Sequence, residues 1–175
     1  MTVVIDATDG GASANSYCTL AYADDYHDSR LHNSVWTAAT DATKNTALVW
    51  ATRVFESKMS WYGAKLHITQ KLGYPRYGVY NENGYLMGYD YSTLQYSVPD
   101  ELKNATAELA FWLITADRMA DPGSKGIKTL SVDVIKLEFD KGDYPTELPN
   151  SVVGMLSRLG RYVSGSSGQI RVRRC

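Results

Sequence analysis

The chain has 175 residues, of which 44% are hydrophobic and 21% are charged, and its formal net charge is −1. This length suffices for one domain with a buried core, and the balanced charge gives no support to a general nucleic-acid or membrane binder. No apolar run approaches the roughly 20 residues of a membrane-spanning helix. The first residues, MTVVIDATDGG, include two acids and no basic residue, so we expect no signal peptide and a cytosolic origin.

Two helices are predicted in the first third of the chain. Thr19 is a suitable N-cap for a short helix over residues 20–31, and Asn33 and Ser34 should end it. Its expected inner face consists of Leu20, Ala23, His27 and Leu31. A second helix, capped by Asp41, should run to about Ser60 because its apolar residues recur at helical spacing.

The middle of the chain is unusually rich in tyrosine. Residues 70–97 contain seven of the thirteen tyrosines. Asn83-Gly84 predicts a two-residue hairpin turn with both residues at positive φ, flanked by strands over 79–82 and 85–87. Pro75 and Arg76 precede it as a turn, so we expect a hairpin with loops on either side.

The last part of the chain predicts two more helices. Pro99, Asp100 and Glu101 favour a helix start, and the apolar residues that follow surround the helix almost completely, which is typical of a central helix. The alternation in residues 127–139 changes phase and predicts either a bulge or two short strands. A final helix after Pro145 or Pro149 should place Val152, Leu156, Leu159 and Val163 on one face.

The predicted fold class is therefore α+β and mainly α, with a four-helix core, a tyrosine-rich β-hairpin insertion and a short strand pair. We expect a single domain over residues 1–163, with residues 70–97 as the insertion. Residues 164–175 should form a flexible basic C-terminal tail. The ends differ in charge, because residues 1–29 contain five aspartates without a Lys or Arg, and no acid follows Glu147.

No motif of catalysis is present in the sequence. It has no phosphate-binding G-x-x-x-x-G-K-[ST] loop, no H-E-x-x-H and no G-x-S-x-G. The carboxylate pairs Asp24-Asp25 and Asp100-Glu101 are explained by helix first turns. Cys18 and Cys175 form no metal or redox motif, and we expect Cys18 to be buried. We therefore predict no enzyme, no metal and no cofactor.

The tyrosines have three possible uses. Exposed rings stack well with single-stranded nucleic acid, but residues 74–96 carry only Arg76 against Glu82 and Asp90. Tyrosine without cations favours contact with a protein. The third interpretation is that Tyr74 and Tyr77 only fill the helical core.

Three ordered stretches carry a family resemblance. They are DGGASANSYCTLAYADDYH at residues 9–27, ALVWATRVFESKMSWYGAKLHITQKLGYPRYGVYNENGY at residues 47–85, and VPDELKNA followed by ELA within residues 98–110. This set resembles a phage family of head-to-tail adaptor (connector) proteins, often catalogued as DnaT-like single-strand DNA-binding proteins. Tyr74 stands where the family often has Trp, which keeps an amphipathic ring.

The resemblance implies a structural virion protein at the head-tail junction, assembled in the host cytoplasm. Such adaptors form a homo-oligomeric ring, implied to be a dodecamer, between the portal protein and a tail or nozzle protein. DNA only passes through the channel that the ring lines, and no membrane is involved. The alternatives are a single-stranded DNA-binding protein of phage replication and a neck or tail-completion protein.

Two interfaces are predicted under the adaptor interpretation. The subunit or tail interface consists of Tyr80, Tyr85, Tyr89 and Tyr91. The portal interface consists of Gln169, Ile170, Arg171, Val172, Arg173 and Arg174. This basic segment is compatible with adding a strand to the portal or to an adjacent subunit.

Overall fold

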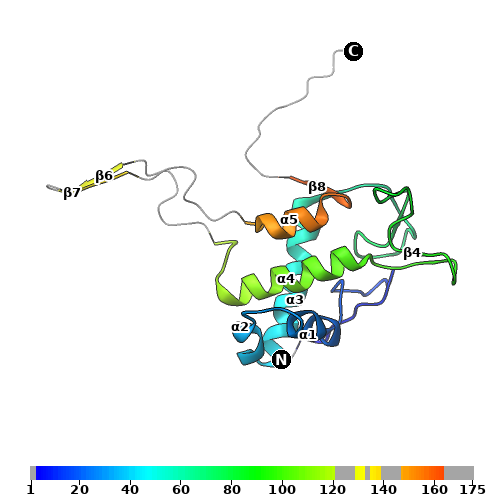
Figure 1. Cartoon of the computed structure of the whole chain (residues 1–175), viewed down its shortest axis with the longest axis horizontal. Helices are drawn as coiled ribbons and strands as arrows, with labels where there is room; N and C mark the ends of the chain where they lie inside the picture. Colours follow the sequence, from blue (N-terminus) through cyan, green and yellow to red (C-terminus); the bar gives the residue numbers. More distant parts are fainter. Residues whose placement is uncertain (1–2, 121–128, 133–134, 139–146, 164–175) are drawn as a thin grey trace, which may run out of the picture.

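The computed structural model describes residues 3–120, 129–132, 135–138 and 147–163, and it shows a mainly helical α+β fold, as predicted (Figure 1). The helices are α1 (Leu20–Asp28), α2 (Ser34–Ala38), α3 (Asp41–Lys58), α4 (Asp100–Thr115) and α5 (Asn150–Leu156). The strands form four antiparallel pairs: β1 (Met59–Trp61) with β8 (Gly160–Tyr162), β2 (Ala64–Lys65) with β3 (Arg76–Tyr77), β4 (Tyr89–Asp90) with β5 (Gln95–Tyr96), and β6 (Thr129–Val132) with β7 (Ile135–Glu138).

Helix α4 is the central element, which confirms the prediction from its apolar surface. It packs against α1, α2, α3 and α5 (Figure 1). Leu102, Ala105 and Leu109 are fully buried along it, and burial of each large aliphatic side chain contributes about 1.5–3 kcal/mol. The carboxylates of Asp100 and Glu101 lie in its first turn, where the helix dipole favours negative charge.

The ends of the first helices differ from the prediction. Helix α1 begins after Thr19, whose Oγ1 accepts a hydrogen bond from Tyr22 N at 3.2 Å, but it ends at Asp28. Leu31 is therefore 82% exposed rather than part of the inner face. The N-cap of α3 is Thr40, not Asp41, because the Thr40 hydroxyl bonds Thr43 N.

A short helix was missed between α1 and α3. Asn33 and Ser34 were expected to end the first helix, but they begin α2, with Asn33 as its N-cap and Ser34 as its first residue. Its Trp36 is buried, and the indole N–H donates to Asp24 Oδ1 at 2.8 Å. Asp24 also pairs with Lys44 at 2.8 Å, so this carboxylate joins three helices instead of serving the first turn of α1.

The last helix is shorter than predicted. Helix α5 follows Pro149 and ends at Leu156, after which the chain turns into β8. Leu159 is still fully buried, whereas Val163 is 48% exposed. The helical spacing of apolar residues over 152–163 therefore predicted too long a helix, because Leu159 and Val163 lie beyond its end. The phase change over 127–139 does correspond to two short strands, with Val132 opposite Ile135.

Candidate functional site

The loop between β1 and β3 is held together by the side chain of Gln70. Its Nε2 donates to the carbonyls of Leu72 and Pro75, both at 3.0 Å, and its Oε1 accepts from His67 N at 3.0 Å. Gln70 is only 4% exposed. These bonds satisfy backbone groups that a loop of this shape would otherwise leave unpaired.

A second clamp in the same loop is Arg76. Its guanidinium donates to the carbonyl oxygens of Tyr62 at 2.6 Å, Gly63 at 2.7 Å and Gly73 at 3.1 Å. These contacts fasten β3 to the segment between β1 and β2. Because its donors are engaged with backbone, Arg76 serves the loop structure.

Glu56 on α3 attaches the loop to that helix. Its Oε1 accepts from the Tyr17 hydroxyl, from Trp61 Nε1 at 3.2 Å and from Gly73 N at 3.1 Å. Burial of Tyr17, together with the Glu56 charge, raises the pKa of the Tyr17 phenol. A carboxylate that accepts several donors at once joins α3, β1 and the loop into one unit.

The interpretation of Tyr74 and Tyr77 as core residues is right for one of them. Tyr74 is 1% exposed, its hydroxyl donates to Leu159 O at 2.9 Å, and burial raises its pKa. Tyr77 is 52% exposed on the edge strand β3. Tyr74 is thus a core residue with a satisfied polar end, and Tyr77 faces solvent.

The hairpin at Asn83-Gly84 exists, but its turn differs from the prediction. Gly84 has φ of 80°, whereas Asn83 does not have positive φ. Gly84 N bonds Asn81 O at 3.1 Å, and Asn81 N bonds Tyr85 O at 2.8 Å. The loop therefore has three residues with glycine in the left-handed position, and Tyr80 pairs with Leu86 across it.

A second hairpin follows where only a loop was expected. Strands β4 and β5 pair Tyr89 with Tyr96, and the turn between them is held by Asp90. The Asp90 carboxylate accepts hydrogen bonds from Ser92 N at 2.8 Å and Ser92 Oγ at 2.6 Å. Hydrogen bonds from Ser92 lower the pKa of Asp90 to about 2. The turn signal was present in the Asp-x-Ser sequence, whose side chain bonds its own backbone two residues on.

The two hairpins gather tyrosine rings into one group. Ring centroids lie 6.0 Å apart for Tyr85 and Tyr91, 4.9 Å for Tyr89 and Tyr91, and 4.7 Å for Tyr89 and Tyr96. Tyr80, Tyr85 and Tyr91 are 59%, 59% and 55% exposed. We call the five residues Tyr80, Tyr85, Tyr89, Tyr91 and Tyr96 the tyrosine surface. Tyr96 was missing from the predicted interface, because only the unrecognised β4–β5 pairing brings it to Tyr89.

The surroundings of the tyrosine surface are acidic. A cleft of about 290 Å³ beside the second hairpin is lined by Asp90, Asp100 and Glu101. Arg158 approaches the first hairpin but pairs with Glu82 at 2.6 Å. Negative charge beside the rings disfavours a phosphate backbone and suits contact with a neutral or basic protein surface.

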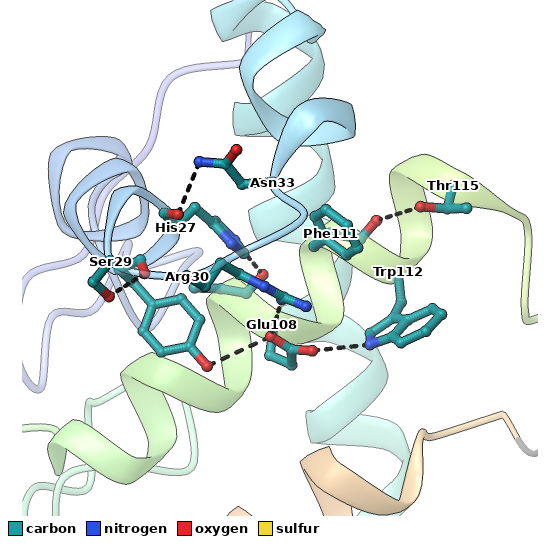
Figure 2. Close-up of polar contacts among 10 residues, drawn as sticks. His27, Ser29, Arg30, Asn33, Glu108, Phe111, Trp112 and Thr115 are labelled. Carbon is teal, nitrogen blue, oxygen red and sulfur yellow. Dashed lines mark hydrogen bonds and ion pairs between the residues drawn. The ribbon is translucent and has the colours of Figure 1, made fainter.

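A buried polar group in the helical core is a second candidate site (Figure 2). Glu108 on α4 pairs with Arg30, and it accepts from Trp112 Nε1 at 3.1 Å. The Arg30 guanidinium lies 4.6 Å from the centre of the Phe111 ring. Both Glu108 oxygens are engaged with protein donors, so this ion pair has a structural role.

His27 completes that core cluster. The ring is fully buried, and its Nε2 donates to Ala107 O at 3.1 Å while Nδ1 has no partner among the described residues. Burial lowers the pKa of His27, with smaller effects from the groups around it. Such a histidine is neutral and packs against Trp36, with ring centroids 4.3 Å apart.

The part of the chain that the structure describes forms neither a metal site nor a membrane span. No group of three or more His, Cys, Asp or Glu side chains there is arranged to hold a metal ion. Within the same residues, no helix has the length and apolarity that crossing a membrane requires. Cys18 is a free buried thiol, as predicted, and burial raises its pKa to about 12.

The predicted portal interface lies outside the described residues. This applies to all six of its members, Gln169, Ile170, Arg171, Val172, Arg173 and Arg174. The structure therefore brings together the tyrosines of the predicted site and leaves the basic segment as a prediction.

Comparison with known proteins identifies a family for this chain. No curated protein and no solved structure matches the chain. A family model described as "Putative DnaT-like ssDNA binding protein" matches residues 1–175. The chain belongs to this DnaT-like family.

Proposed function

We propose that this protein is a structural head-to-tail adaptor, which forms a ring between a phage portal and the tail and has no catalytic role. The observation that carries the proposal is the tyrosine surface. Three of its rings are more than half exposed, yet their hairpins are held by backbone bonds and by the Asp90 turn. A rigid, exposed group of amphipathic rings is typical of a surface that binds protein.

The charges of the chain support a contact between unlike surfaces. Residues 1–29 are acidic, and the segment after Glu147 is basic. In a ring, each subunit presents one surface to a different surface of its neighbour, so complementary ends favour closure. The partners are then further copies of the chain, a portal protein and a tail or nozzle protein, and the location is the virion.

The stoichiometry of purified particles tests the adaptor function. Quantitative mass spectrometry would compare the abundance of this chain with that of the portal protein. A ratio near one supports a ring matched to the portal. Absence from particles, with abundance only in the lysate of infected cells, would refute it.

The basic C-terminal segment has its own test. Deletion of residues 164–175 should abolish docking to the portal and leave the unfolding temperature of the domain unchanged. Docking at the level of the full chain would show that the tail is not the portal interface.

A second candidate function is binding of single-stranded DNA. The description of the matching family names this activity, so the comparison favours it more directly than the adaptor function. Steep salt dependence of binding would be its signature. The tyrosine surface is a poor place for it, because the nearby cation Arg76 clamps carbonyl groups and acids line the adjoining cleft.

A further inference from the structure

A different part of the molecule carries free positive charge. A cleft of about 420 Å³ opens between α3 and the loop at residues 71–72, and Arg53 and Lys71 line it. Both residues are exposed. Neither forms an ion pair with a carboxylate among the residues described.

The other cations of this segment have structural partners. Lys58 pairs with Glu147 at 2.7 Å, and Arg76 holds the loop carbonyls. Lys65 Nζ lies 3.4 Å from the carbonyl oxygens of Gln70 and Lys71, so it adds positive charge close to the cleft. Arg53 and Lys71 are thus the cations whose role the fold does not explain.

The two hydroxyl groups of the cleft wall donate to backbone carbonyls of α3. Thr52 Oγ1 donates to Leu48 O at 3.0 Å, and Ser57 Oγ donates to Val54 O at 2.9 Å. These hydroxyl groups form no hydrogen bond with Arg53 or Lys71. Arg53 and Lys71 therefore remain available to an external ligand.

Two carboxylates oppose this charge in part. Glu56 lines the cleft, but its Oε1 accepts from Tyr17, Trp61 and Gly73, which directs that oxygen into the protein. Asp6 is hydrogen-bonded by Thr8, which lowers its pKa, and Lys71 lowers that pKa further. The three cations Arg53, Lys65 and Lys71 still outnumber these two acids.

We infer that this cleft is a phosphate site for single-stranded DNA, with Arg53 and Lys71 contacting the backbone. The inference rests on the second candidate function and gives that activity a location away from the tyrosine surface. Trp61, which is partly exposed, does not line the cleft, but its indole N–H donates to Glu56, which does. Single-strand binders hold the phosphates with cations and stack the bases on aromatic side chains, so the cleft would supply the phosphate contacts.

Binding of a labelled oligothymidylate, followed by fluorescence anisotropy at several salt concentrations, tests this site. The full chain is compared with the double variant Arg53→Ala, Lys71→Ala. Each phosphate contact on a single strand contributes about 0.7 to the slope of log K against log salt concentration. Loss of two contacts should therefore reduce the slope by about 1.4.

The matched control is Lys103→Ala, Arg158→Ala, which removes the same charge from side chains paired with Asp100 and Glu82. It should retain the slope, and circular dichroism would verify that both variants fold. If the full chain binds and the cleft variant keeps the slope, the location is wrong although the DNA-binding function stands. If the full chain does not bind, the DNA-binding function and the site fall together.

Discussion

The loop at residues 61–77 and the hairpins at residues 79–96 are neighbours in sequence but use their polar side chains in opposite ways. In the loop, Gln70, Tyr74 and Arg76 turn their polar atoms onto backbone carbonyls of the protein. In the hairpins, Tyr80 and Tyr85 are each 59% exposed. The first region buries these side chains against its own backbone, whereas the second exposes tyrosine rings to a partner, so mutations of these residues should have separable effects.

The largest expected effect on stability comes from substituting a glycine of the loop, Gly73, and a glycine of the first hairpin serves as its control. A Cβ at Gly73 would lie 2.4 Å from Trp61 Nε1 and 2.8 Å from Glu56 Oε1. Gly73→Ala should therefore lower the free energy of unfolding by about 3 kcal/mol, through overpacking and disrupted hydrogen bonds. Chemical denaturation would measure it.

The control for this change is Gly84→Ala in the first hairpin. A Cβ at Gly84 would meet no atom within 4 Å, but φ is 80°, so left-handed backbone strain should cost about 1 kcal/mol. Equal losses for both alanines would contradict the division between loop and hairpin.

A smaller effect should follow from removing one hydroxyl. Tyr74→Phe loses the bond to Leu159 O, although this carbonyl keeps its bond from Tyr62 N, so the change should cost about 1 kcal/mol. Tyr85→Phe alters an exposed ring and should change stability by less than about 0.5 kcal/mol. Thermal unfolding of both variants compares them directly, and an inverted order would refute the assignment of Tyr74 to the core.

The helical core and the hairpins should also respond differently to acid. His27 has a lowered pKa in the folded protein, so below its ordinary value of about 6.5 the unfolded chain binds more protons. Its stabilising contribution is complete above that pH and is lost as the pH falls towards the folded pKa. The Asp90 turn, with a pKa of about 2, should persist through this range.

Calorimetry between pH 7 and pH 5 would show this difference as a falling unfolding temperature. His27→Gln should flatten that slope, because the titrating ring is gone. An unchanged slope would mean that other groups control the acid response. Nuclear magnetic resonance of the Ser92 amide, which donates to Asp90, would report whether the hairpin turn stays intact.

The smallest effect on stability is expected at the tyrosine surface itself. Tyr80→Ser and Tyr85→Ser remove rings that are each 59% exposed. Each should lower the free energy of unfolding by no more than about 0.5 kcal/mol. A loss above about 2 kcal/mol would mean that these rings form a core, contrary to the account given for this region.

Sequence patterns predicted the helical framework because it depends on local periodicity and caps. Thr19 as a cap and α4 as the central helix follow from such signals, whereas the burial of Cys18 follows from the general preference of free thiols for the core. The hairpin at Gly84 was found from its turn residues, although its loop has one more residue than expected.

The remaining features depend on contacts between distant residues. Strand β8 pairs with β1 across about a hundred residues, and helical spacing gave no sign of it. Helix α2 is held by the bond from Trp36 to Asp24, which no local pattern predicts. The cleft at Arg53 and Lys71 was missed because those residues are eighteen positions apart and meet only in the folded chain.

Incorporation of variants into particles tests the central claim most directly. A fourfold variant carries serine in place of Tyr80, Tyr85, Tyr89 and Tyr91. The control is the double variant Tyr62→Ser, Tyr77→Ser, which alters two exposed tyrosines outside the tyrosine surface. Each folded variant would be supplied to a phage that lacks the wild-type chain, and purified particles would be quantified by mass spectrometry. The adaptor account predicts that the fourfold variant is absent from particles while the control is incorporated normally. Normal incorporation of the fourfold variant would contradict it.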